Sequence, residues 1–198
     1  MRGYFGIGVE RISKAMNVGS LFRTAHAFGA SFVFTVDAAY RRAEVAKADT
    51  SDSLGQLPFY RFPDLDALVL PEGCEIVGVE LTDESIDMPS FRHPPRAAYV
   101  LGPERGSLSA GMMQRCRHIV KIPTSFCINV GLAGAITLYD RCLSTGGFQA
   151  RPVRPGGPTV APRVHQHGGP VLRREMEAYR AEAPLGEIAA LKQETTKS

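Results

Sequence analysis

Short apolar runs and segments of helical periodicity alternate along residues 1–143. The apolar runs are rich in Val, Ile and aromatic residues and predict strands at 4–10, 31–36, 75–81, 96–101 and 118–122. The segments of helical character predict helices at 17–29, 64–70, 109–116 and 129–143. Strands separated by helices predict an α/β fold with a mostly parallel sheet that is covered by helices on both faces.

The predicted helix at 17–29 carries signals for both of its ends. Its apolar residues fall at i, i+3, i+4, i+7 and i+10, which places them on one stripe. Asn17 is a preferred N-cap residue, and Gly29 is the residue type that most often follows a helix. The segment 37–63 is polar and irregular, and its Thr and Ser residues at 50–53 fit either a short capped helix or a mobile loop.

The composition fits one globular domain with a well-buried core. The chain has 198 residues, of which 44% are hydrophobic and 22% charged, so disorder of the whole chain is excluded. The longest apolar stretches, 97–101 and 130–136, are far shorter than the roughly 20 residues that cross a bilayer. The amino-terminal sequence also lacks the features of a secretory signal. We therefore expect a cytoplasmic protein without a membrane partner.

The spacing of the cysteines argues against a structural metal site. Four cysteines lie 42, 11 and 15 residues apart, which is not the spacing of zinc ligands. We expect free thiols in a reducing compartment. His165 and His167 form an isolated pair, too few ligands for a stable site, so no metal is expected.

Charge and composition both change near residue 144. Residues 1–143 hold 15 Lys and Arg against 15 Asp and Glu, whereas residues 144–198 hold 8 against 5. Gly and Pro make up 11 of the 27 residues at 144–170, which is typical of a flexible or extended linker. The sequence thus predicts a folded domain at 1–143 and a basic tail at 144–198, with a possible short helix at 171–183. A net charge of +3 does not by itself indicate nucleic-acid binding.

Three segments that end predicted strands or begin predicted helices stand out: 17–23 (NVGSLFR), 101–108 (LGPERGSL) and 122–133 (IPTSFCINVGLA). The second contains two glycines but lacks the Lys of a P-loop, and no segment has the three glycines of a dinucleotide site. In a parallel sheet such loops gather at the carboxyl edge, where ligands bind. A pocket built from them would present backbone groups, one Arg, one Glu and one or two Asn.

In this order and at this separation, the three segments resemble motifs 1, 2 and 3 of the SpoU (TrmH) family of RNA ribose 2′-O-methyltransferases, within the SPOUT superfamily. Their combined pattern is N-x-G-x-x-x-R, then L-G-x-E-x-x-G, then I-P followed by I-N-V and a helix of small residues. The resemblance covers roughly residues 4–143. It implies an α/β fold with a carboxyl-terminal trefoil knot, S-adenosylmethionine as cofactor, and homodimers whose active sites lie near the subunit interface.

The resemblance also implies roles for individual residues. Four positions match the catalytic residues of the family: Asn17, Arg23, Glu104 and Asn129. Seven positions match or adjoin its cofactor contacts: Leu81, Leu101, Gly102, Gly106, Ile122, Cys127 and Ile128. This chain departs from the family at Cys127, where many members have Ser, and its loop before that residue is shorter than in several subgroups.

The chemistry of methyl transfer needs no metal. It needs a pocket that aligns the donor sulfur, the methyl carbon and the acceptor oxygen. A ribose hydroxyl must also lose its proton during attack, which requires a base or a positive group near the developing alkoxide. An ordinary guanidinium has no lone pair to accept a proton. Two roles for Arg23 therefore stay open: general base, or stabiliser of the alkoxide that also orients an RNA phosphate.

The substrate is expected to be RNA, with transfer RNA favoured. The sequence begins almost directly at the catalytic domain, whereas many relatives that act on ribosomal RNA have an amino-terminal RNA-binding domain. One alternative is a ribosomal-RNA methyltransferase, and another is a non-catalytic RNA-binding or assembly protein of the same fold. Six basic residues are candidates for phosphate contacts: Arg41, Arg42, Lys47, Arg151, Arg154 and Arg163.

Several residues near the motifs have plainer explanations. Phe126 is expected in the core and Cys127 as a small buried hydrophobe. His26 is expected at the surface. Gly131 and Gly134 are expected to let another element approach the last helix closely, and packing within the monomer explains them well enough.

Overall fold

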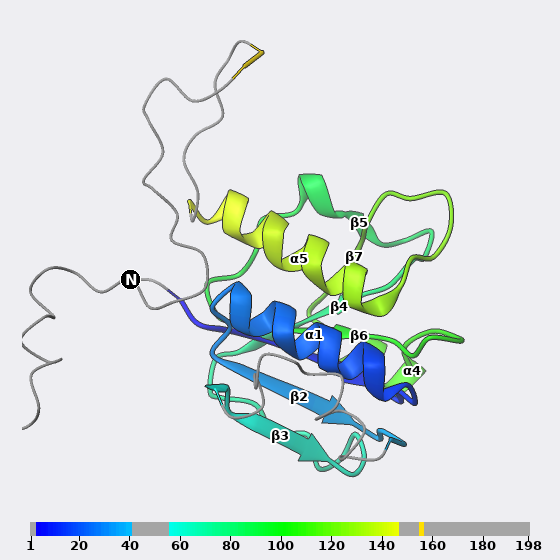
Figure 1. The fold of residues 1–198 in the computed structure, drawn as a ribbon. Helices are drawn as coiled ribbons and strands as arrows, with labels where there is room; N and C mark the ends of the chain where they lie inside the picture. The colour runs from blue at the N-terminus through cyan, green and yellow to red at the C-terminus, as the bar shows by residue number, and fades with distance from the viewer. Residues whose placement is uncertain (1–2, 41–55, 147–154, 157–198) are drawn as a thin grey trace, which may run out of the picture. The chain divides into compact units, whose positions relative to one another are not determined.

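The computed structural model describes residues 3–40, 56–146 and 155–156 (Figure 1). Its strands are β1 (Phe5–Glu10), β2 (Phe32–Val36), β3 (Phe59–Phe62), β4 (Glu75–Val79), β5 (Ile86–Asp87), β6 (Ala97–Leu101) and β7 (His118–Lys121). Its helices are α1 (Ala15–Ala27), the 3₁₀ helix η1 (Met88–Ser90), α4 (Ala110–Arg115) and α5 (Val130–Ser144). The chain divides into two compact units, Met1–Ala150 and Arg151–Ser198, and every element named here belongs to the first.

The strands form one parallel sheet in the order β3-β2-β1-β6-β4-β7-β5. The predicted α/β fold with a mostly parallel sheet is therefore confirmed. Strand β4 lies between β6 and β7 although it precedes both in the chain. The loops that follow β4, β6 and β7 consequently lie next to one another at the carboxyl edge.

Helices cover both faces of the sheet. Figure 1 shows α1 and α5 side by side on one face. Strand β6 alternates between the two layers: Tyr99 packs into the core beneath α1 and α5, and Val100 packs into the second core with Met112 of α4. Burial on both faces explains why β1, β2 and β6 are almost continuously apolar. A Cβ atom at Gly134 would lie 2.2 Å from Cδ1 of Leu21, so this glycine permits the close contact of α5 with α1, as expected.

The two ends of α1 differ in how well the sequence predicts them. Gly29 follows the helix with a φ of +72°, and Gly29 and Ala30 donate to the carbonyls of His26 and Ala25 in a Schellman arrangement, as predicted. The N-cap prediction for Asn17 is wrong. The helix begins at Ala15 after Lys14, so Asn17 lies inside its first turn, and its side chain is used elsewhere.

Two further sequence expectations need correction. The predicted helix at 64–70 is absent; the segment forms turns, in which Asp64 Oδ1 accepts from the Ala67 amide, between Pro63 and Pro71. Strand β3 lies within the segment described as irregular, because it is a short strand with only two partly buried positions. The other predicted strands and helices match observed elements to within two residues at each end.

Several of the expectations concern residues 41–55, 147–154 and 157–198, which lie outside the described residues. These include the six candidate phosphate contacts, the histidine pair and the short helix expected at 171–183. Among the described residues, no helix is long and apolar enough to span a membrane. The four cysteines all lie in the described part of the chain and are free thiols.

Candidate active site

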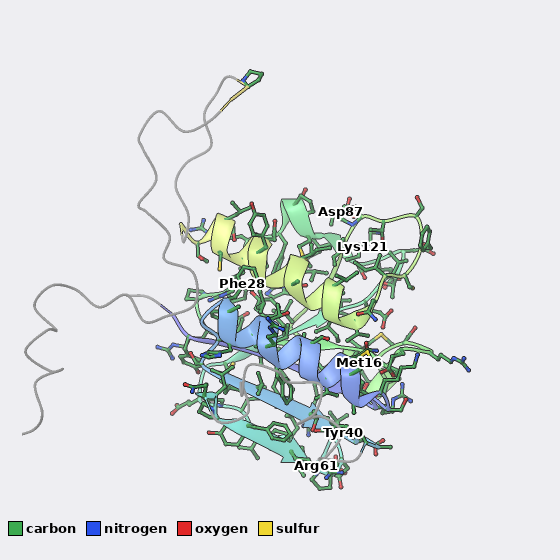
Figure 2. All side chains as sticks on the ribbon, viewed as in Figure 1. Met16, Phe28, Tyr40, Arg61, Asp87 and Lys121 are labelled. Carbon is green, nitrogen blue, oxygen red and sulfur yellow. The ribbon has the colours of Figure 1, made fainter. Side chains whose placement is uncertain are left out.

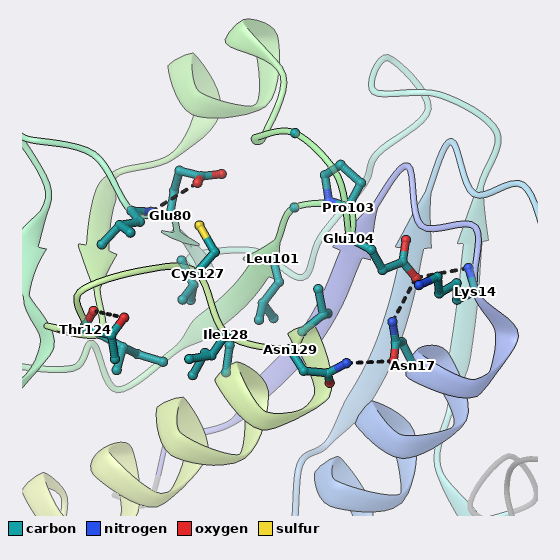
Figure 3. Close-up of a pocket in the computed structure, with 17 residues that line it drawn as sticks. Lys14, Asn17, Glu80, Leu101, Pro103, Glu104, Thr124, Cys127, Ile128 and Asn129 are labelled. Carbon is teal, nitrogen blue, oxygen red and sulfur yellow. Dashed lines mark hydrogen bonds between the residues drawn. The ribbon is translucent and has the colours of Figure 1, made fainter.

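A pocket with a cavity volume of about 390 Å³ opens at the carboxyl edge of the sheet (Figure 3). Three loops line it, following β4, β6 and β7, together with the first turn of α1 and the start of α5. These segments are widely separated in the sequence. The strand order brings them together, as the parallel-sheet argument predicted.

A chain of polar side chains joins three of these segments at one side of the pocket. Asn129 Nδ2 donates to Asn17 Oδ1 at 3.1 Å, and Asn17 Nδ2 donates to Glu104 Oε1 at 3.0 Å (Figure 3). Asn17 is only 8% exposed, and its side-chain amide has a hydrogen-bond partner on each side. These hydrogen bonds fix the two amides and the carboxylate at the wall of the pocket before any ligand binds.

Glu104 is held by the start of α1. Its carboxylate accepts from the backbone amides of Lys14 at 3.0 Å and Ser13 at 3.4 Å, and from the Asn17 side chain. Partial burial raises the pKa of Glu104, but hydrogen bonds from its own backbone amide, from Asn17 and from the two helix-start amides outweigh that effect. The net pKa of Glu104 lies below its usual value, so this side of the pocket carries a negative charge at neutral pH.

Asn129 has a second task, because it is the N-cap of α5. Its Oδ1 accepts from the Gly131 amide at 2.8 Å while its Nδ2 reaches Asn17. One side chain thus orders both the loop after β7 and the row of hydrogen-bonded side chains in the pocket. A Cβ atom at Gly131 would lie 3.2 Å from Asn129 Oδ1, so a larger residue there would crowd this cap.

The loop after β6 is anchored from several directions. Glu80 accepts from the Leu108 amide at 2.8 Å, and Arg11 donates to the Ser107 carbonyl at 2.6 Å. Glu10 accepts from the amide and hydroxyl of Ser109, which caps α4. These hydrogen bonds hold the pocket wall in place before a ligand binds. The wall therefore loses little conformational entropy on binding.

The pocket also has an apolar part. Leu101, Ile122 and Ile128 line it beside Val79 and the exposed Leu81. Two expectations for this loop are wrong: Cys127 is exposed and lines the pocket, and Phe126 is 75% exposed instead of packing in the core. Both residues lie on a loop that leaves the sheet edge to form the pocket wall. Their apolar character therefore does not predict burial.

The chain matches the model of the SpoU rRNA Methylase family over residues 5–139, which is more than half of its length. The chain belongs to this family. Over 138 residues it is 28% identical to the tRNA (guanosine(18)-2'-O)-methyltransferase TARBP1 of Mus musculus, a match that covers 65% of this chain and 9% of that protein.

Solved structures show the same fold. The SpoU methyltransferase AviRb from Streptomyces viridochromogenes, in complex with AdoMet, is 21% identical, with a TM-score of 0.64 over 75% of this chain and 60% of that one. A structure concerned with the 2-OH methylation of C/U34 on tRNA is 17% identical, with a TM-score of 0.62 over 73% of this chain and 92% of that one. The chain thus spans only part of TARBP1 and AviRb.

The pocket of this SpoU family chain is lined by nearly all of the residues singled out in the sequence. Three of the four catalytic candidates line it: Asn17, Glu104 and Asn129. All seven cofactor candidates also line it: Leu81, Leu101, Gly102, Gly106, Ile122, Cys127 and Ile128. The three motifs therefore meet in one place.

Arg23 is the exception. It is exposed on α1 and is not among the residues that line the pocket of its own chain. It lies six residues beyond Asn17, or about 9 Å further along the helix axis, and points about 120° away around that axis. Within one protomer, Arg23 thus lies apart from the hydrogen-bonded side chains of Asn17, Glu104 and Asn129.

Sequence reasoning missed two charged residues of the pocket, Lys14 and Glu80. Glu80 had a readable signal, because a carboxylate directly follows a buried strand and precedes Leu81. Nothing in the sequence indicated Lys14, because the helix was predicted to begin at residue 17, whereas Lys14 directly precedes its first residue, Ala15. Among the described residues no group of His, Cys, Asp or Glu is arranged to hold a metal ion.

Proposed function

We propose that this chain transfers a methyl group from S-adenosylmethionine to a ribose 2′-hydroxyl of RNA, with transfer RNA as the preferred substrate. The observation that carries the proposal is the meeting of the three motif loops in a single pocket, with Asn17, Glu104 and Asn129 joined at one side. The chain spans only part of its relatives, so the activity of the whole protein is inferred from this site and from the family.

The pocket suits the proposed cofactor. Its volume of about 390 Å³ lies in the range of small-molecule sites, and its lining combines apolar side chains with loop backbone. The carboxylate of Glu104, which is negatively charged at neutral pH, complements the positive charge of a sulfonium. When bound, S-adenosylmethionine would supply the methyl group. The residues of the chain would align it with the ribose and exclude water.

We propose that the functional form is a homodimer. On α5, Leu132, Ile136 and Tyr139 are 61%, 41% and 45% exposed, and their spacing of four and three residues puts them on one face. Met16 on the neighbouring α1 is 72% exposed (Figure 2). Such an apolar face fits a second copy of the same surface.

A dimer through this face would also give Arg23 a role. The helix that carries Arg23 would lie at the interface, so the guanidinium would serve the pocket of the partner subunit instead of its own. There it would stabilise the alkoxide and orient an RNA phosphate, or accept the proton if its surroundings allow. The site would then be complete only in the dimer.

The proposed preference for transfer RNA draws support from two relatives. TARBP1 is named for guanosine 18 of tRNA, and another matching structure concerns position 34 of tRNA. The alternative substrate is ribosomal RNA, which the family description names.

Methyl transfer is tested by incubating the protein with tritiated S-adenosylmethionine and either purified transfer RNA or purified ribosomal RNA. We expect label in transfer RNA, recovered as a 2′-O-methylnucleoside after digestion and mass spectrometry. Label in ribosomal RNA alone would show that the substrate is ribosomal RNA and not transfer RNA. If the protein bound the cofactor and RNA but transferred no methyl group to either RNA, the proposed enzymatic activity would be refuted, and an assembly protein would be indicated.

The role of Arg23 is tested by Arg23→Ala, with the exposed Arg92→Ala as control. We expect Arg23→Ala to abolish transfer while cofactor affinity in a calorimetric titration stays nearly unchanged. Mixing Arg23→Ala with Asn129→Ala should restore about a quarter of wild-type activity, because half of the dimers would be mixed and each would hold one complete site. Loss of cofactor binding in Arg23→Ala would contradict the assignment, and failure of the mixture to recover would contradict a shared site.

We also propose that the region from β4 to α5 forms the trefoil knot that the family resemblance implies. The position of β4 between β6 and β7 is compatible with it. An experimental structure traced continuously from residue 75 to residue 144 tests the proposal, and a chain path that opens when both ends are pulled would refute it.

A further inference from the structure

Glu80 is a carboxylate in the pocket wall to which no role has so far been given in ligand binding. It directly follows β4 and precedes Leu81. In Figure 3 it lies across the pocket from Asn17 and Glu104. The pocket therefore has two acidic sides, one built around the catalytic candidates and one around Glu80.

The hydrogen bonds of Glu80 leave part of its capacity for a ligand. Its Oε1 accepts from the Leu81 amide at 3.1 Å and its Oε2 accepts from the Leu108 amide at 2.8 Å. A carboxylate offers about four acceptor positions, so each oxygen retains one. The two bonds also fix the plane of the carboxylate against the backbone, which prepares it for a ligand with two neighbouring donors.

Gly102 brings the opposing loop close to this carboxylate. A Cβ atom at Gly102 would lie 3.3 Å from Glu80 Oε2 and 3.1 Å from the Leu108 amide nitrogen. A side chain at residue 102 would press on both partners of the shorter hydrogen bond. The glycine keeps the carboxylate in place and leaves the space beside it to the pocket.

Two hydroxyl donors on adjacent carbons, as in a ribose, match a fixed carboxylate whose two oxygens each retain an acceptor position. We propose that Glu80 binds the two ribose hydroxyls of the cofactor's adenosine. This inference rests on the proposed function, and it deepens that proposal by assigning a specificity residue for the cofactor. It places the adenosine end of the cofactor beside Glu80 and leaves the side of Glu104 to the transferred methyl and the RNA.

A purely structural role for Glu80 predicts a different behaviour. Glu80 also ties the loop after β6 to β4, so its loss would loosen that loop and weaken binding of every ligand alike. Arg11 provides a matched control, because it ties the same loop through the Ser107 carbonyl and does not line the pocket. Glu75 provides a second control, since it lies at the other end of β4 and contacts His118 at 3.3 Å.

The test is a calorimetric titration with S-adenosylhomocysteine and with its 2′-deoxy and 3′-deoxy analogues. It is carried out on the full chain and on Glu80→Gln, Arg11→Gln and Glu75→Gln, whose folding is checked by thermal unfolding. For the full chain we expect each deoxy analogue to bind at least about tenfold more weakly, as for a lost hydrogen bond to a charged group. In Glu80→Gln this penalty should shrink to about threefold or less.

The controls separate the possible outcomes. Arg11→Gln should weaken all three ligands by the same factor and keep the deoxy penalty, and Glu75→Gln should change neither. A deoxy penalty that is unchanged in Glu80→Gln would overturn the inference while leaving the proposed function standing. Failure of the unmodified chain to bind S-adenosylhomocysteine would overturn both.

Discussion

Helix α5 carries a polar network at each end, and the two networks differ in how much of their hydrogen-bonding capacity the protein itself uses. At its start, Asn129 joins Asn17 and Glu104 at the wall of an open pocket. Toward its other end, Asp140 and Arg141 join a network around the buried side chains of His93 and Tyr99. One network faces the pocket, and the other faces the core.

The polar side chains of the buried network use most of their hydrogen-bonding atoms within the protein. His93 uses both ring nitrogens, one with Tyr99 Oη at 2.5 Å and one with Asp140 at 2.9 Å. Arg141 donates to the carbonyls of Pro94 at 2.7 Å and Pro95 at 3.0 Å, and to Tyr99 Oη. Burial raises the pKa of Tyr99 to about 12, although nearby Arg141 acts in the opposite direction. Tyr99 therefore stays neutral and can serve this network as a hydroxyl.

The network around Arg141 is built to stabilise the fold, and the network around Asn17 lines the pocket of the proposed reaction. A buried polar group that loses its partner is costly, so the saturated network should matter most for stability. The open network lies at a solvent-facing edge, where water can replace a lost partner. Its loss should therefore affect the reaction more than the fold.

The largest expected effect comes from Arg141→Met. This change removes the side chain that donates to the carbonyls of Pro94 and Pro95 and to Tyr99 Oη, and we expect the free energy of unfolding to fall by about 3–5 kcal/mol. Denaturation in urea measures it. The control is Arg92→Met at an exposed position, where the change should stay within about 0.5 kcal/mol. Equal stability of the two variants would show that the buried network does not hold the fold together.

The next effect is on the reaction and comes from Asn129→Ala, compared with Ser109→Ala. Both changes remove a side chain that caps a helix, and each should cost about 1 kcal/mol of stability or somewhat more. Only Asn129→Ala also releases Asn17 in the pocket, so we expect it to slow methyl transfer by about 100-fold. Ser109→Ala loses one of two hydrogen bonds to Glu10 and should slow transfer far less, because the Ser109 amide still binds Glu10. Single-turnover assays with saturating cofactor measure the rates. A similar loss in Ser109→Ala would mean that helix fraying, and not the amide chain, controls the reaction.

The sequence predicts the open network better than the buried one, and the reason lies in how each is encoded. Glu104 lies in the short Gly- and Pro-containing loop after β6, and Asn129 directly precedes α5, so local patterns in the sequence indicate both places. His93, by contrast, lies between Arg92 and two prolines, in a segment with no periodicity. Its partners are 6 and 47 residues away, and no local pattern specifies such a distance.

Even within the pocket, local rules fail where a contact is long-range. Asn17 has the residue type of an N-cap, yet its side chain pairs with Glu104, 87 residues away, and the helix begins before it. Phe126 has the residue type of a core position, but its loop forms a pocket wall. In both cases the local preference of the residue type is real, but contacts made in the tertiary structure place the side chain elsewhere.

The smallest effect is a difference in the pH range over which the two networks lose stability. Burial lowers the pKa of His93 below its ordinary 6.5, and the opposing influence of Asp140 does not restore it. The unfolded chain therefore binds more protons at His93, so this contribution to stability is lost as the pH falls through 6.5. Glu104 also has a lowered net pKa, so its contribution is present above 4.5 and is lost as the pH falls further.

Urea denaturation at a series of pH values should separate the two networks. We expect a decline in the free energy of unfolding that begins near pH 6.5 and is flattened by His93→Gln, whereas the exposed His26→Gln leaves it unchanged. A second decline below about pH 4.5 should be reduced by Glu104→Gln and should be accompanied by loss of cofactor binding, because the pocket then loses a negative charge. If His93→Gln and Glu104→Gln altered the same pH range, the two ends of α5 would be one coupled network, and the distinction between a stabilising end and a reactive end would fail.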